Sequence, residues 1–148
     1  MQQEAAVIDA ENLQAQQAML QEITNDIRAA YEPSWSRRGL WDRSYNESRT
    51  PEVPAMLLEL LSHQNFADMK YGLDPSFRFT VSRAIYKGIL KYLSLANNVP
   101  YTVQPLPVAN FAAELNGEGA VKLTWSPVSD PAEPTAEPTG YVVYTKLN

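Results

Sequence analysis

The stretch VPAMLLELLSHQNFADM, residues 53–69, begins with an apolar run that one carboxylate interrupts. Five of the six residues from 55 to 60 are apolar, and Glu59 is the exception. A run with so little alternation predicts a strand buried on both faces, as at the centre of a parallel sheet. Because an unpaired buried carboxylate is costly, Glu59 is either satisfied by a neighbour or placed there for its chemistry.

Helices are expected on both sides of this strand. Residues 2–31 predict one long helix ended by Pro33, with an apolar stripe at helical spacing: Leu13, Leu20, Ile23, Ile27 and Tyr31. Residues 32–52 indicate a long loop with one short strand near 40–45. After the apolar run, Ser62 is expected to cap a short helix at 64–71. Asp74 and Pro75 suit the N-cap and first position of a closing helix that ends near 97–98 and packs against the sheet.

The composition changes from residue 101, where the helical stripe is lost. Strands are predicted at 108–115, at 121–125 and at 141–146, with a turn at 116–119 and a proline-rich loop at 127–138. Helix-rich material followed by strand-only material indicates two domains, 1–98 and 104–148. The predicted fold class is therefore α/β for the first domain and all-β for the second.

Charge and composition argue against some classes of binding partner. Seventeen acidic and twelve basic residues give a net charge of −5, which argues against a nucleic acid or an anionic membrane surface. No run reaches the roughly 18 apolar residues of a membrane span, and the first residues lack the pattern of a signal peptide. The chain has no cysteine and one histidine, His63, so we expect it to bind no metal alone, because a catalytic zinc site needs three protein ligands.

Several short motifs occur in order along residues 15–95. They are Arg38-Gly39, Arg49-Thr50, Pro54-Ala55, Leu57, Glu59, Leu61-Ser62 and Gly88-Ile89-Leu90. This ordered set resembles the C-terminal part of the zinc-dependent N-acetylmuramoyl-L-alanine amidases. The resemblance implies the end of an α/β catalytic domain with a parallel or mixed sheet, zinc as cofactor in the intact parent, peptidoglycan as substrate and a periplasmic or extracellular location. The family's zinc ligands, two histidines and a glutamate, lie upstream of the part that is matched, and His63 stands where the family usually has asparagine.

Residues 104–148 resemble the opening of a fibronectin type III domain, an immunoglobulin-like sandwich. The matching residues are Pro107-Val108, Leu123 with Trp125, and Tyr141 to Tyr144. Such a sandwich has about seven strands in roughly 100 residues, so we expect an incomplete domain with Trp125 as a core residue.

The resemblance implies that Glu59 is the catalytic carboxylate, which takes a proton from the attacking water and returns it to the leaving amine. A structural role at the end of a buried strand is the alternative. Arg38, Arg49 and His63 are candidate substrate contacts, since arginine binds carboxylates with two hydrogen bonds. Salt bridges to glutamates are the alternative for the arginines, and a hydrogen-bonded turn is the alternative for His63. The competing hypothesis for the whole chain is a non-catalytic binding or scaffolding fragment of the cell envelope.

Overall fold

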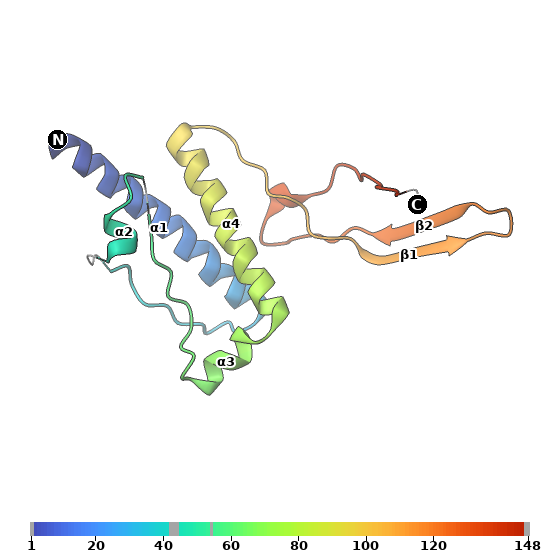
Figure 1. Ribbon diagram of the computed structural model, residues 1–148, viewed down its shortest axis with the longest axis horizontal. Coiled ribbons are helices and arrows are strands. Elements are labelled where there is room, and N and C mark those ends of the chain that lie inside the picture. Colours follow the sequence, from blue (N-terminus) through green and yellow to red (C-terminus); the bar gives the residue numbers. More distant parts are fainter. Residues whose placement is uncertain (1, 42–44, 54, 147–148) are drawn as a thin grey trace. The chain divides into compact units, whose positions relative to one another are not determined.

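The computed structural model describes residues 2–41, 45–53 and 55–146 (Figure 1). It is a mixed structure of helices and one two-stranded antiparallel sheet. The chain divides into two compact units, Met1–Tyr101 and Thr102–Asn148. The division falls within the interval 98–104, where the composition changes, and each unit is described by itself below.

Two long helices form the first unit. Helix α1 spans Gln2–Ala30 and helix α4 spans Pro75–Asn97, and Figure 1 shows them side by side. Their contact buries six residues: Met19, Ile23, Ile27, Phe77, Val81 and Ala84. The prediction of a long first helix is confirmed, but its buried stripe is only partly the predicted one. Leu13 is exposed and Met19 is buried, because the position of α4 decides which face of α1 is covered.

The two helices approach closely at Gly88. A Cβ atom on Gly88 would lie 2.7 Å from the Cα of Met19 and 3.2 Å from its backbone nitrogen. Both atoms belong to the backbone of α1, so no side chain can move aside to make room. Glycine at this position therefore sets how near α4 can come to α1.

The predicted ends of α4 are confirmed. The side chain of Asp74 accepts a hydrogen bond from the backbone N–H of Ser76 at 2.8 Å, and Pro75 occupies the first turn. These contacts satisfy an otherwise unpaired donor and preset the backbone for a helix. Asn98 ends the helix with a left-handed backbone, φ 51°, a conformation that asparagine tolerates better than most residues. The apolar side of α4 packs on α1, so the prediction that it packs on a sheet is wrong in this chain.

Two short helices come between α1 and α4 in the sequence. Helix α2 spans Asn46–Arg49 in the region predicted as a loop, and helix α3 spans Phe66–Gly72. Asn65, and not Ser62, caps α3, because its side chain accepts a hydrogen bond from the N–H of Ala67 at 2.9 Å. The predicted strand near 40–45 is absent at 40, 41 and 45, and residues 42–44 lie outside the described part.

The predicted strand at 53–60 is not formed at its described positions, where the backbone pairs with no other strand. The apolar pattern is that of a strand, but a strand needs a neighbour to hydrogen-bond with. In the described chain the only sheet is the hairpin of the second unit. The expected parallel sheet is therefore not present in these residues.

The second unit contains an antiparallel hairpin. Strand β1, Ala109–Leu115, pairs with strand β2, Val121–Ser126, in a register that is irregular between Ala109 and Ala112. The side chain of Asn116 holds the turn by accepting hydrogen bonds from the N–H groups of Glu118 and Ala120. These two strands and their turn were predicted.

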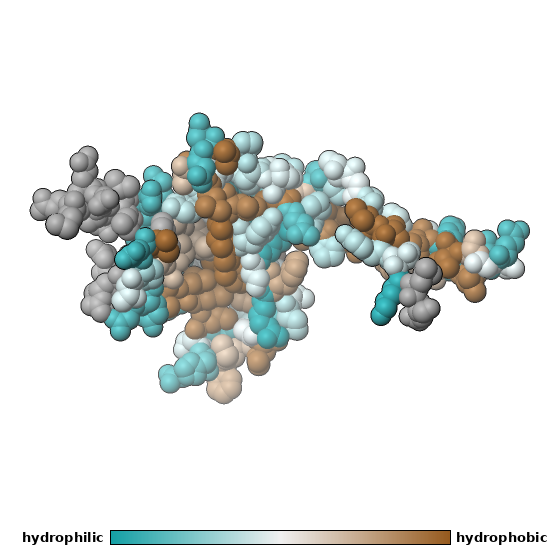
Figure 2. All heavy atoms as spheres, turned by 45° about the horizontal axis from the view of Figure 1, so that its top comes forward, coloured by the Kyte–Doolittle hydropathy of each residue, from teal (hydrophilic) through white to brown (hydrophobic). Residues whose placement is uncertain are grey.

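The predicted third strand at 141–146 is not formed. Trp125 is half-buried, and its ring meets the ring of Tyr141 edge to face at 5.2 Å. A short 3-10 helix, η1, spans Pro134–Ala136 within the proline-rich loop. Figure 2 shows hydrophobic atoms on the visible surface of the hairpin, where Leu115 is 74% exposed. Two strands cannot cover both of their own faces.

Candidate functional site

The segment that carries Glu59 lies against the helices of the first unit. The side chain of Asn12 on α1 accepts a hydrogen bond from the backbone N–H of Ala55 at 2.8 Å. Met56, Leu60 and Leu61 are half-buried and pack against the core formed by α1 and α4. One side of the segment is thus fixed to the helical layer by a polar contact at its start and apolar contacts along it.

The backbone of this segment is unpaired. Residues 56–61 make no hydrogen bond to any described part of the chain. Backbone N–H and C=O groups in folded proteins are almost always paired with protein or water. Six successive residues that pack on one side and leave their backbone unpaired have the arrangement of a strand without its sheet.

Glu59 lies on the open side of the segment. Its side chain is exposed, as are Leu57 and Leu58, so the expectation that Glu59 is buried is wrong for this chain. The reason is that Met56, Leu60 and Leu61 face the helical core, and no strand among the described residues covers the other side of the run. Within the described residues, Glu59 forms neither a hydrogen bond nor an ion pair. It is therefore a solvated carboxylate at the edge of an apolar segment.

Neither Arg38 nor His63 bonds to Glu59 in the part of the chain that the structure describes. The guanidinium of Arg38 lies 5.8 Å from the ring centre of Trp41, and His63 is an exposed turn residue. No hydrogen bond or ion pair joins any two of Arg38, Glu59 and His63. The salt bridge considered for Arg38 is not formed with a described acid. Arg49 is the last residue of α2, and its side chain lies outside the described part.

The loop that follows α1 is anchored by Trp35. Its backbone carbonyl accepts two hydrogen bonds from the guanidinium of Arg28, at 3.0 and 2.8 Å. Its ring meets those of Tyr71 and Phe77 at 5.3 and 5.9 Å, within the range of favourable aromatic pairs. Trp35 thus ties the loop to the helical core.

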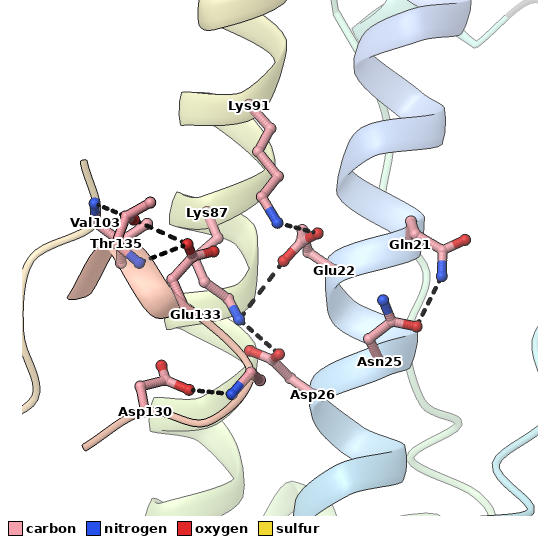
Figure 3. A network of polar contacts seen from close by, with 11 residues as sticks. Gln21, Glu22, Asn25, Asp26, Lys87, Lys91, Val103, Asp130, Glu133 and Thr135 are labelled. Carbon is pink, nitrogen blue, oxygen red and sulfur yellow. Dashed lines mark hydrogen bonds and ion pairs between the residues drawn. The ribbon is translucent and has the colours of Figure 1, made fainter. Parts of the chain in front are cut away.

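A buried network of charged side chains connects α1 to α4, and the sequence reasoning missed it (Figure 3). The amine of Lys87 lies 2.6 Å from Asp26 and 3.5 Å from Glu22, and the amine of Lys91 lies 2.8 Å from Glu22. Lys87 is 1% exposed. One signal in the sequence could have revealed it: acids and lysines each repeat at a spacing of four beside the buried positions of their helices.

The described residues do not form a metal centre. They contain no group of three histidine, cysteine, aspartate or glutamate side chains that could hold a metal ion. The carboxylates of Glu22 and Asp26 are held by lysines, which compete with a cation for the same oxygens. The part of the chain described here therefore does not fit zinc by itself.

A groove of about 500 Å³ runs along another part of the first unit. Its polar lining is Gln14, Gln17 and Gln21 from α1 and Arg37 from the following loop. Ala18, Leu20, Leu40 and Leu95 supply the apolar lining. The sequence reasoning did not single out these glutamines, although they share one face of α1 at spacings of three and four.

Comparison with known proteins gave no match: no family model fits the chain, and no curated protein or solved structure is significantly similar to it. No described helix combines the length and hydropathy that a bilayer span requires.

Proposed function

We propose that residues 1–98 are the C-terminal part of a zinc-dependent N-acetylmuramoyl-L-alanine amidase domain, followed at 104–148 by an incomplete fibronectin type III-like domain. The intact parent hydrolyses the amide between the lactyl group of N-acetylmuramic acid and L-alanine in peptidoglycan, in the periplasm or outside the cell. The ordered motifs that end in residues 54–62 and 88–90 support this assignment. The chemistry of the proposed site depends on Glu59.

One observation carries the proposal: among the described residues Glu59 has no bonding partner, and it lies on an apolar segment, 56–61, whose backbone bonds to no described residue. In an α/β domain the missing partner is a neighbouring strand, and the carboxyl ends of parallel strands are where such domains place their sites. With strands beside it, residues 53–60 become the central strand and Glu59 lies at its carboxyl end. The local dielectric then falls, and the proton affinity of a carboxylate rises with burial.

In the proposed reaction Glu59 acts first as a general base and then as a general acid. Its carboxylate accepts a proton from the attacking water, while the water oxygen bonds to the amide carbon. The tetrahedral intermediate then breaks its C–N bond, and Glu59 gives the proton to the departing amine of L-alanine. The products are a lactyl carboxylate and a free amine. Because the described residues do not fit zinc, the proposal places the zinc ligands in the intact parent outside this chain.

The test replaces Glu59 with glutamine in the intact parent. Glutamine keeps the size and one hydrogen-bonding oxygen of the side chain but cannot accept the proton. We expect muropeptide release to fall by about 10² to 10⁴-fold, while zinc content and melting temperature stay near those of the parent. Glu52→Gln is the matched control, because Glu52 is an exposed acid directly before the segment.

Two results would contradict the catalytic assignment. One is near-normal release by Glu59→Gln with zinc bound. The other is equal loss of release in Glu52→Gln and Glu59→Gln. A parent that binds peptidoglycan but releases no muropeptide with any variant would instead identify a binding or scaffolding protein.

A further inference from the structure

The groove lined by Gln14, Gln17, Gln21 and Arg37 has the size of a site for a small ligand. Its volume of about 500 Å³ lies within the range of small-molecule pockets, roughly 300–1,000 Å³. Arg37 is the one charged residue in its lining, and no acid lines it. In a chain with a net charge of −5, this groove presents a positive charge beside neutral amides.

The polar groups of the groove are available to a ligand. The side chains of Gln14, Gln17 and Arg37 make no hydrogen bond or ion pair with any described residue. Gln21 donates one hydrogen bond to Asn25 at 2.7 Å, which leaves its carbonyl oxygen as an acceptor. Each carboxamide both donates and accepts, and a guanidinium offers five donors that match a carboxylate.

The spacing of the glutamines matches an extended peptide. Gln14 and Gln21 are separated by seven helical steps, or about 10 Å along α1. An extended peptide advances about 3.3 Å per residue, so three peptide units span the same length. A peptide backbone presents both N–H donors and C=O acceptors. Each glutamine carboxamide can accept from the first and donate to the second. Leu20, Leu40 and Leu95 offer apolar contact for small side chains.

We propose that this groove binds a short, extended peptide that ends in a free carboxylate, with the carboxylate on Arg37 and its peptide groups along the three glutamines. A nucleic acid does not fit, because its affinity depends on several cations acting together, and the groove has one. The inference goes beyond the proposed amidase activity and does not depend on it: the groove shares no lining residue with the segment that carries Glu59.

The experiment titrates the 148-residue chain with two probes, N-acetyl-trialanine with a free carboxylate and the same peptide with a C-terminal amide. Binding is followed by NMR, using the side-chain NH₂ signals of Gln14 and Gln17, which only a ligand in the groove shifts directly. We expect saturable shifts with the carboxylate probe at about 1 mM, a weak affinity typical of few contacts. The amide probe should bind at least about tenfold more weakly, since it loses the charge-assisted hydrogen bonds to Arg37.

Two substitutions test whether binding depends on the arginine of the groove or on any exposed positive charge of the chain. Arg37→Gln should weaken the carboxylate probe by about tenfold or more and remove the difference between the two probes. Arg78→Gln is the matched control, because Arg78 is an exposed arginine on α4 that does not line the groove, and it should leave both affinities unchanged. Circular dichroism confirms that each variant is folded.

Three outcomes would overturn the proposal. They are shifts too small to saturate up to about 10 mM, equal binding of the two probes to the unaltered chain, and equal weakening by Arg37→Gln and Arg78→Gln. Saturable, carboxylate-dependent shifts that Arg37→Gln alone abolishes would establish the site.

Discussion

Replacing Lys87 with methionine tests the energetic role of the network between α1 and α4. Methionine keeps the length of the side chain but removes its charge, so the carboxylate of Asp26, at 2.6 Å, and one oxygen of Glu22, at 3.5 Å, lose their cation. The side chains of Glu22 and Asp26 are 9% and 10% exposed. Water cannot replace the lost amine easily at such burial.

The expected cost follows from this geometry. Removing one partner of a buried ion pair destabilises a protein by about 3–5 kcal/mol, because the other charge stays buried without its counter-ion. Glu22 keeps Lys91 at 2.8 Å, so most of the loss comes from Asp26. For a unit of this size the melting temperature should fall by about 10 °C or more.

The assay is urea unfolding followed by circular dichroism at 222 nm, where α1 and α4 dominate the signal. Lys91→Met is the matched control. Its amine also contacts Glu22 but is 27% exposed, and Glu22 keeps Lys87 in that variant, so the loss of stability should be smaller than for Lys87→Met. The double variant Lys87→Met with Asp26→Leu should recover part of the loss, because it also removes the buried carboxylate that has lost its lysine. A Lys87→Met chain within about 0.5 kcal/mol of the original, the range of ordinary surface changes, would refute the reasoning.

Three further predictions follow from other features. Gly88→Ala should destabilise the first unit by about 1–3 kcal/mol in urea unfolding, since its methyl group would lie 2.7 Å from the backbone of Met19, and unchanged stability would mean that the helices separate at no cost. In the loop after α1, the hydroxyl and backbone N–H of Ser34 both donate to Glu32, and these two hydrogen bonds lower the pKa of Glu32. Ser34→Ala removes the hydroxyl bond and keeps the backbone one, so the pKa of Glu32 should rise toward its ordinary value and stay somewhat below it, as NMR titration would measure. The stabilisation from these bonds is present above the ordinary pKa of about 4.3. It is lost as the pH falls through the lowered pKa. Zinc titration calorimetry of the chain alone should show no one-to-one binding below micromolar, since the described residues contain no three-ligand group, and tight stoichiometric binding would contradict this.

The helices were predictable where their signals are local. The cap by Asp74 and Pro75 and the stop at Asn98 depend on neighbouring residues alone, so the bounds of α4 followed from the sequence. Which face of α1 is buried depends on α4, which begins 45 positions after α1 ends. Leu13 therefore lies exposed although it fits the stripe, whereas Met19 packs opposite Gly88.

The strand at 53–60 failed for a different reason. A helix satisfies its own backbone, but a strand is completed only by another strand. The apolar pattern of this segment is a local property, and its pairing is not. The burial of Glu59 could not be predicted for the same reason, because it would depend on strands that the described residues do not supply. The charge network required knowledge of how α1 and α4 align, since Lys87 and Asp26 are 61 positions apart.

The open segment at 56–61 also affects how this chain behaves when it is handled in isolation. Proteases bind their substrates as extended strands through backbone hydrogen bonds. The backbone groups of residues 56–61 bond to no described residue, so they are open to such a contact. The same groups, next to exposed Leu57 and Leu58, can pair with an identical segment of a second chain. We therefore expect limited digestion and concentration-dependent self-association to begin at this segment, and a peptide bound along it to suppress both.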